Sequence, residues 1–177
     1  MNIYGEKIIL RAIEATDAEL LLDIINDPET ERMLGGSSFP VSSEQQSQWI
    51  RSQLGRSDVL RCIIADKNTP SVGIGTIILS DIDMKNAIAQ VHLKLANADI
   101  RGKGYGTDAL KAIVSYAFNE LRLNCLYAEV LEYNVISQKL FEKCGFKKDG
   151  LLRDRVYKDG EFRSLIAYSL VKDDLSK

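Results

Sequence analysis

Seven stretches of the chain have hydrophobic patterns typical of β-strands. In residues 87–96, Val91, Leu93 and Leu95 share one face and polar residues fill the other, which is the period of a half-buried strand. Residues 124–131 hold almost no polar residue before Glu129, as expected of a strand buried on both faces. The seven predicted strands are residues 6–13, 59–66, 72–83, 87–96, 124–131, 151–157 and 161–170.

Apolar residues at helical spacing follow two of these strands. A stripe from Ala109 to Leu121 recurs every three or four residues, which predicts a long helix packed on a sheet. A second helix is expected over 135–144. Asn134 is a suitable cap at its start, and Gly145 a suitable residue after its last turn.

The N-terminal part predicts two further helices. Thr16 followed by Glu19 has the spacing of a capping box, and the helix should end before Pro28, which disfavours helical geometry at the preceding residue. After a glycine- and serine-rich loop at 35–40, Ser42 or Ser43 should begin another helix that extends to about Leu54.

These elements predict an α/β (α+β) fold in a single domain over residues 1–177. The sheet should be mixed, mostly antiparallel and seven-stranded, with helices on both faces. Asp159-Gly160 is a typical hairpin turn between the last two strands. That hairpin could either close the sheet or pair with a second copy in a homodimer.

Composition narrows the classes of partner. A net charge of -2 gives no reason to expect nucleic acid, and no apolar run has the length of a membrane span. The first residues lack a signal-peptide pattern, so a cytoplasmic protein is expected. Cys62, Cys125 and Cys144 are widely spaced, and with a single histidine they offer too few ligands for a structural metal site.

The segment between the strand at 87–96 and the long helix carries the main candidate chemistry. Arg101-Gly102-Lys103-Gly104-Tyr105-Gly106 places glycines at alternate positions directly before the helix. Such a loop can turn its backbone N–H groups toward an anion, and the helix N-terminus adds the positive end of its dipole. The spacing fits neither the P-loop nor the Rossmann motif, and a plain turn before a helix would share its composition.

The pattern R-x-x-G-x-G from Arg101 to Gly106 resembles the pyrophosphate-binding signature of the GNAT N-acetyltransferase superfamily. The later segment N-V-I-S-Q-K-L-F-E-K-C-G-F, residues 134–146, resembles the second motif of the same family. Both occur in the family's order, and the resemblance covers nearly the whole chain. It is nearest to the branch of ribosomal-protein N-terminal and spermidine acetyltransferases.

This resemblance implies that acetyl-coenzyme A is the acyl-donor substrate and lies between two strands that splay apart in the middle of the sheet. The residues expected to line the pantetheine arm are Leu93, Lys94, Leu95 and Ala96. Those expected to hold the pyrophosphate are Arg101, Gly102, Lys103, Gly104, Tyr105, Gly106 and Thr107. Asn134 and Ser137 occupy family positions that contact the cofactor.

The catalytic pattern departs from the family at two positions. Phe141 replaces the tyrosine that usually protonates the leaving thiolate, so either Ser137, Tyr133 or a water is the acid, or no acid is needed. Gln90 replaces a frequent glutamate base. His92 lies on the same strand face and has a suitable pKa, and Glu132 at a strand end is the second candidate base.

The expected function is acetyl transfer to a primary amine, in a small molecule or a protein N-terminus, within a ternary complex. The alternatives are a transferase for a longer acyl group and a non-catalytic module that binds coenzyme A. Four acidic residues near the expected acceptor groove would suit a polyamine, although charged helix faces need no ligand: Asp27, Glu29, Glu31 and Glu44.

Overall fold

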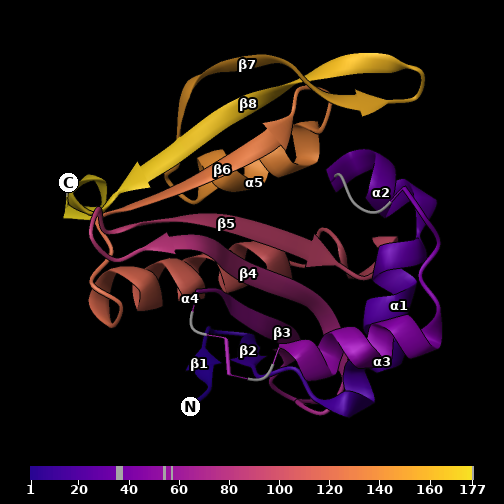
Figure 1. Ribbon diagram of the computed structural model, residues 1–177. Helices are drawn as coiled ribbons and strands as arrows, with labels where there is room; N and C mark the ends of the chain where they lie inside the picture. The colour runs from indigo at the N-terminus through magenta and orange to yellow at the C-terminus, as the bar shows by residue number, and fades with distance from the viewer. Residues whose placement is uncertain (35–37, 54, 57, 177) are drawn as a thin grey trace.

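The computed structural model describes residues 1–34, 38–53, 55–56 and 58–176, and Figure 1 shows one curved sheet with helices packed on it. Within these residues the sheet has eight strands, in the order β1-β2-β3-β4-β5-β6-β8-β7. Their bounds are β1 Ile3–Tyr4, β2 Ile8–Arg11, β3 Leu60–Asp66, β4 Gly73–Asp83, β5 Ile88–Leu95, β6 Cys125–Leu131, β7 Lys147–Lys158 and β8 Glu161–Val171.

The helices gather on both faces of the sheet. They are α1 Ala18–Asn26, α2 Pro28–Leu34, α3 Ser43–Ser52, α4 Tyr105–Asn119 and α5 Val135–Lys143, with short 3₁₀ helices at Ala15–Asp17, Ala98–Ile100 and Lys172–Ser176. In the described ranges no helix has the length and apolar character needed to cross a bilayer.

The sheet consists of two halves that meet over a short contact. The pairs within β1–β5 and within β6–β8–β7 are antiparallel, whereas β5 and β6 pair in parallel over only three residues, from Ile88 to Gln90 on β5. In Figure 1 the two strands separate beyond this contact. The expected splay in the middle of the sheet is therefore present.

Most of the buried apolar side chains lie between the sheet and α4 with α5. Alternate residues of the strands, such as Ile77 and Leu79 of β4, pack with Leu110 and Ile113 of α4 and are fully buried. The opposite faces of β3, β4 and β5 are covered by α1 and α3. The prediction of helices on both faces of the sheet is therefore confirmed. A cavity lies between the sheet and the helices α1 and α3.

The seven predicted strands all occur, and β1 is the additional eighth. The predicted hairpin is longer than expected, because β7 begins at Lys147, and it continues the same sheet through β6–β8 pairing. Asp159 and Gly160 both have positive φ, 51° and 86°, as the two central residues of a type I′ turn do. A homodimer through this hairpin stays a prediction.

The prediction of a cap at Thr16 is wrong. Thr16 lies inside a 3₁₀ helix, and the side chain that accepts the hydrogen bond is that of Asp17, from the N–H of Glu14 (2.8 Å). The end of α1 before Pro28 is confirmed, but Pro28 itself begins α2, a helix the sequence analysis did not predict.

The other helix ends mostly agree with expectation. Ser42 caps α3 by accepting from the N–H of Gln45 (3.2 Å), and α3 ends at Ser52. Leu54, to which this helix was expected to extend, and the predicted loop residues 35–37 lie outside the described residues. Gly145 follows α5 with φ of +92°, as a residue after a helix end requires.

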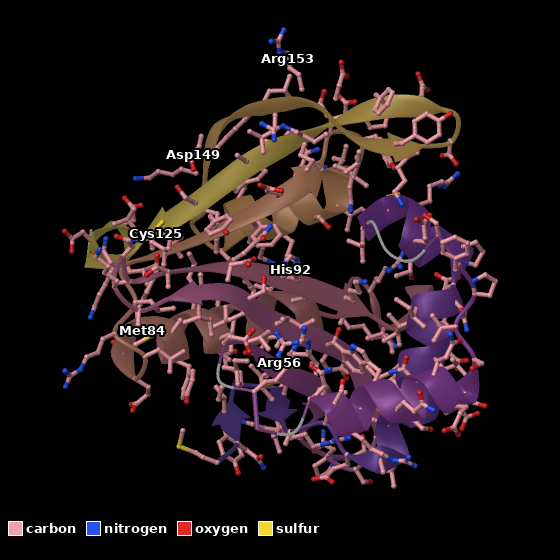
Figure 2. All side chains as sticks on the ribbon, viewed as in Figure 1. Arg56, Met84, His92, Cys125, Asp149 and Arg153 are labelled. Atoms are coloured by element: carbon pink, nitrogen blue, oxygen red, sulfur yellow. The ribbon has the colours of Figure 1, made fainter. Side chains whose placement is uncertain are left out.

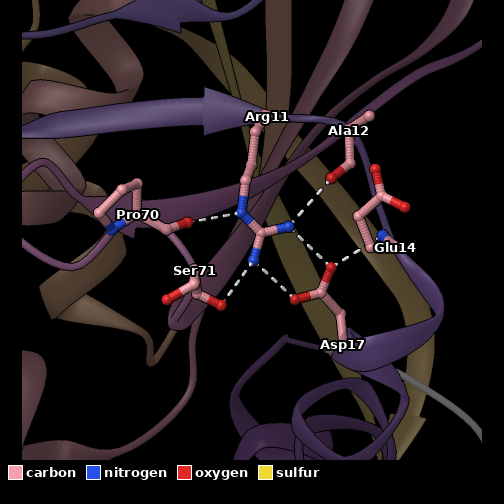
Figure 3. Close-up of polar contacts among 6 residues, drawn as sticks. All are labelled: Arg11, Ala12, Glu14, Asp17, Pro70 and Ser71. Carbon is pink, nitrogen blue, oxygen red and sulfur yellow. Dashed lines mark hydrogen bonds and ion pairs between the residues drawn. The ribbon is translucent and has the colours of Figure 1, made fainter.

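Asp17 is held in place by Arg11, at the end of β2 (Figure 3). The guanidinium makes two hydrogen bonds to the carboxylate, at 2.7 and 2.8 Å, and its Nε donates to the carbonyl of Pro70 (2.8 Å). Asp17 is only 3% exposed, so this bidentate pair is shielded from water. It fixes the start of α1 relative to β2 and to the turn between β3 and β4.

A second, partly exposed anchor joins the N-terminal hairpin to α4. The carboxylate of Asp108, in the first turn of α4, accepts hydrogen bonds from the backbone N–H groups of Glu6, Lys7 and Ile8 at 2.7–3.0 Å. A Cβ at Gly5 would lie 2.6 Å from this carboxylate, so glycine is needed there. The contact sets where α4, and hence the glycine loop before it, begins.

We therefore expect Asp108→Ala to lower the free energy of unfolding by about 2 kcal/mol, because three backbone donors lose a charged acceptor. Urea unfolding followed by circular dichroism measures the change. Asp149→Ala is the matched control, since Asp149 points into solvent from β7 (Figure 2) and should cost less than about 0.5 kcal/mol. Equal stability of the two variants would contradict this role of Asp108.

Candidate active site

The divergence of β5 from β6 opens a cleft in the middle of the sheet. Pairing stops after Gln90 on β5 and Tyr127 on β6, although both strands continue for several residues. A cavity of about 70 Å³ lies between them. It is lined from β5 by residues 91–94, from β6 by residues 129–131, and from the surrounding helices mainly by Met33, Leu34, Asn134, Ser137 and Phe141.

A larger cavity of about 240 Å³ continues from this cleft to the glycine loop. The two cavities share lining residues, including Leu93, Asn134 and Ser137. Gly104, with φ of +88°, is the N-cap of α4, and the first bond of the helix runs from Asp108 N to Gly104 O (3.0 Å). The N–H groups of residues 105–107 precede that bond, so they have no acceptor within the helix.

The charges around this larger cavity are positive. Arg101 lines it from the loop, and Lys143 lines it from the last turn of α5. Arg101 also makes an ion pair with Glu29 of α2, at 3.3 Å. Together with free N–H groups and the helix dipole, these cations form a site suited to a diphosphate. The sequence analysis missed Lys143, because only the packing of α5 brings it opposite the loop.

Not every residue of the predicted loop faces the cavity. Gly102, Gly106 and Thr107 line it with Arg101 and Gly104, whereas Lys103 and Tyr105 do not. The Tyr105 hydroxyl donates instead to Asp66 (2.5 Å). Ala96 is turned toward β4, where its N–H donates to the carbonyl of Ile74 (2.9 Å). Contact of Lys103, Tyr105 and Ala96 with the cofactor stays a prediction.

The helix α2 covers the cleft and is held there by the corner between β6 and α5. Its last carbonyls have no helical partner, and two side chains satisfy them. The Tyr133 hydroxyl donates to Arg32 O (2.5 Å), and Asn134 Nδ2 donates to Met33 O (2.8 Å). Asn134 also caps α5 by accepting from Ser137 N (3.1 Å). A single buried amide thus joins α2 to α5 beside both cavities.

His92 lies on β5 (Figure 2) and lines the cleft, and its Nε2 is hydrogen-bonded to the Ser80 hydroxyl of β4, at 2.9 Å. The Ser80 hydroxyl in turn donates to Asp81 (3.0 Å). Since a serine has one hydrogen to donate, its oxygen accepts from His92 Nε2–H, which leaves Nδ1 with the free lone pair. Burial, and then the charge of Lys94, lowers the pKa of His92, so the ring is neutral near pH 7.

The other predicted catalytic residues differ in their positions. Ser137 is half-buried and lines both cavities. Glu132 lines neither of them, and its carboxylate accepts from the N–H of Ser164 (3.1 Å) at the edge of β8. The Tyr133 hydroxyl already donates its hydrogen bond to Arg32 O of α2. Phe141 is buried against Phe146 and Tyr168 and gives the cleft an apolar wall.

The cysteines offer no activated thiolate. Burial raises the pKa of all three thiols, that of Cys62 to about 11, and none of them lines the cleft or the larger cavity. Across the described part of the chain, no group of three or more histidine, cysteine or acidic residues is arranged to hold a metal ion.

Comparison with known proteins identifies a protein family whose model matches this chain. The family model described as "Acetyltransferase (GNAT) domain" matches residues 7–147. The chain is 31% identical over 173 residues to "Uncharacterized N-acetyltransferase p20" of Bacillus licheniformis, covering 97% of this chain and 96% of that one. It is 30% identical to "Putative ribosomal N-acetyltransferase YdaF" of Bacillus subtilis, covering 95% and 93%.

Among solved structures, a spermidine N-acetyltransferase from Vibrio cholerae, crystallised with CoA and spermine, superposes with a TM-score of 0.88. The match covers 98% of this chain and 100% of that one, at 18% sequence identity. At this level of sequence identity, the structural similarity establishes that the two proteins share a fold.

The His92 environment predicts a measurable titration. As the only histidine in the chain, His92 gives a single imidazole signal in NMR, and we expect it to titrate below pH 6.5. Lys94→Met should raise this pKa, because a neighbouring positive charge is removed. Lys85→Met, at an exposed residue outside the cleft, should leave it unchanged. Titration at or above 6.5 in the wild type would contradict the buried, cation-flanked setting.

Proposed function

This chain belongs to the GNAT acetyltransferase family, and from that premise we propose that it transfers an acetyl group from acetyl-coenzyme A directly to a primary amine. The observation that carries the proposal is the joined pair of cavities: a narrow one between the splayed strands, and a wider one ending at the glycine loop and the N-terminus of α4. The donor of this family has a matching shape, with a slender thioester arm and a diphosphate.

The residues around the wider cavity fit the diphosphate. Free N–H groups at the start of α4 would donate to its oxygens, and Arg101 and Lys143 would offset its charge. Beyond Gln90, the edge of β5 facing β6 is unpaired. The pantetheine arm contains amides, so it would pair with this edge as an added strand does.

Donor binding also has to accommodate α2. Arg101 pairs with Glu29 of that helix, and the buried amide of Asn134 is bonded to Met33 O. We assign to Arg101 an exchange of its partner from Glu29 to a phosphate. We assign to Asn134 the role of holding α2 over the bound arm, with its second amide hydrogen left for the donor.

The transfer step requires a base for the amine and support for the departing sulfur. The amine nitrogen bonds to the thioester carbonyl carbon, the carbon–sulfur bond breaks, and one proton leaves the nitrogen. Nδ1 of neutral His92 is the proposed acceptor of that proton, and the Ser80–Asp81 pair steadies the charged ring. The Ser137 hydroxyl is proposed to donate a hydrogen bond to the sulfur.

Direct transfer within a ternary complex is favoured over a covalent acetyl-enzyme. An acetyl-cysteine intermediate would need a reactive thiolate beside the donor, and the raised pKa values of the three buried or half-buried thiols oppose this. Initial rates should therefore give intersecting lines in double-reciprocal plots, and mass spectrometry should find no acetylated protein after incubation with donor alone.

For the donor, calorimetry should detect acetyl-coenzyme A binding, and Gly106→Asp should weaken it at least tenfold. The new carboxylate would stand at the start of α4, where it blocks and repels the diphosphate. Gly150→Asp is the matched control, because Gly150 has open space around its Cα and lies on β7. Undetectable binding to the wild type, or equal affinity of both variants, would refute the donor site.

For the base, we expect His92→Ala to lower kcat by about 10²-fold or more, because the acceptor of the amine's proton is removed. In the wild type the neutral ring is the active form, so kcat/KM should rise with pH through a pKa below 6.5. This rise of kcat/KM at low pH should disappear in His92→Ala. The change of kcat/KM at higher pH, which is caused by deprotonation of the amine substrate, should persist. An unchanged profile and rate would exclude His92 from the chemistry.

A further inference from the structure

A third cavity lies on the sheet face opposite α4, between the sheet and helices α1 and α3. Its volume is about 380 Å³, within the range of small-molecule sites, which is roughly 300–1,000 Å³. Leu21 and Ile24 of α1, Trp49 of α3 and Ile78 of β4 give it mainly apolar walls. Lys94 lines both this cavity and the cleft, so the two lie next to each other at that residue.

The charged residues of this cavity are both cations. Lys94 and Arg61 line it, and no aspartate or glutamate does among the described residues. Neither cation takes part in an ion pair within the described ranges. Arg61 donates from Nη1 to Gln53 Oε1 (2.8 Å) and lies 5.5 Å from the Trp49 ring centroid, while its Nε is buried without a partner. A half-buried guanidinium with unused donors is suited to an anion.

The acidic residues that would favour a polycation do not line this cavity. Glu31 pairs with Lys158, whereas Glu29 pairs with Arg101 and would be released when Arg101 turns to a phosphate. The remaining two have local roles on α2 and α3: Asp27 accepts from Thr30 N (2.7 Å), and Glu44 accepts from Gln48 Nε2 (3.0 Å). Among the residues that line this cavity, a polyamine would therefore meet two cations and no carboxylate. Glu31 and Asp58 attract Lys94 and Arg61 from outside the lining.

The geometry also sets where the two ends of a ligand would lie. Lys94 is on β5 at the cleft, whereas Arg61 is on β3, with β4 between them, so the two strand axes are about 10 Å apart. An amine placed at the cleft and an anionic group placed at Arg61 would be at opposite ends of a molecule, with an apolar section against α1 and α3.

We propose that the acceptor is a small amine with an apolar body and an anionic group at its far end, bound by Arg61. This rests on the proposed acetyl transfer and narrows its acceptor class. The positive charge that remains near the cleft would also favour the neutral, nucleophilic form of the amine.

The experiment compares 6-aminohexanoate, its carboxamide, hexylamine and spermidine by thiol release from acetyl-coenzyme A. We expect kcat/KM for 6-aminohexanoate to exceed that for the other three at least tenfold. Arg61→Met should abolish this preference and leave the carboxamide within about twofold of its wild-type value. Arg51→Met is the matched control: Arg51 is an exposed cation in the last turn of α3 that does not line the cavity, and its removal should keep the preference.

A binding measurement separates this inference from the transfer activity. Trp49 is the only tryptophan and lines the cavity, so its fluorescence should change on titration with 6-aminohexanoate, with at least tenfold weaker binding in Arg61→Met. Such binding without turnover would support the acceptor site and refute the proposed transfer. Preference for spermidine, equal use of acid and carboxamide, or equal binding to Arg61→Met would overturn the assignment of Arg61.

Discussion

The parallel contact between β5 and β6 is the constraint on which the candidate site depends. It joins two antiparallel half-sheets over three residue pairs and then ends, while β6 remains paired with β8 over seven. Backbone N–H and C=O groups on the facing edges then need other partners, because unsatisfied polar groups are costly away from water. A ligand that carries its own amides would supply such partners, which is why we propose that the donor's pantetheine arm binds where the sheet is interrupted.

A few polar contacts determine how the helices are placed around this opening. Asp108 fixes the start of α4 against the N-terminal hairpin, and the pair of Arg11 with Asp17 fixes the start of α1. Asn134 links α2 to α5 at the cleft. Each of these side chains satisfies several groups at once, which makes the geometry specific where apolar packing alone would tolerate small shifts. The positions of both ends of the cleft follow from these contacts.

Positively charged groups lie on both sides of the cleft, one set beside α4 and the other beside α1 and α3. On the α4 side, free N–H groups with Arg101 and Lys143 make a place for a diphosphate. On the α1 and α3 side, Lys94 and Arg61 lie near His92, and the nearby positive charge together with burial lowers the pKa of that ring. Burial is the main cause of the lowered pKa of His92, and the two cations that would attract an anionic acceptor lower it further. Acceptor choice and base strength are coupled through these two cations.

The sequence by itself determined the elements whose signals are local. Strand periodicity, the glycine loop before α4 and the caps at Ser42 and Asn134 depend on residues a few positions apart, and all are present. The two motifs that resemble the GNAT family also led to the prediction of acetyl-coenzyme A as the donor and of two strands that separate in the middle of the sheet. Tertiary structure decided what depends on distant partners: Asp17, and not Thr16, directly precedes α1, and its carboxylate pairs with Arg11 of β2 and accepts from the N–H of Glu14.

Contacts between distant parts of the chain also decide which of the candidate catalytic and binding residues lie at the cleft or its neighbouring cavity. Strand pairing takes Glu132 to the β8 edge, away from the cleft, and places Arg61 two strands from Lys94 on one cavity wall. The register between strands far apart in the chain sets such contacts, and no local pattern encodes it.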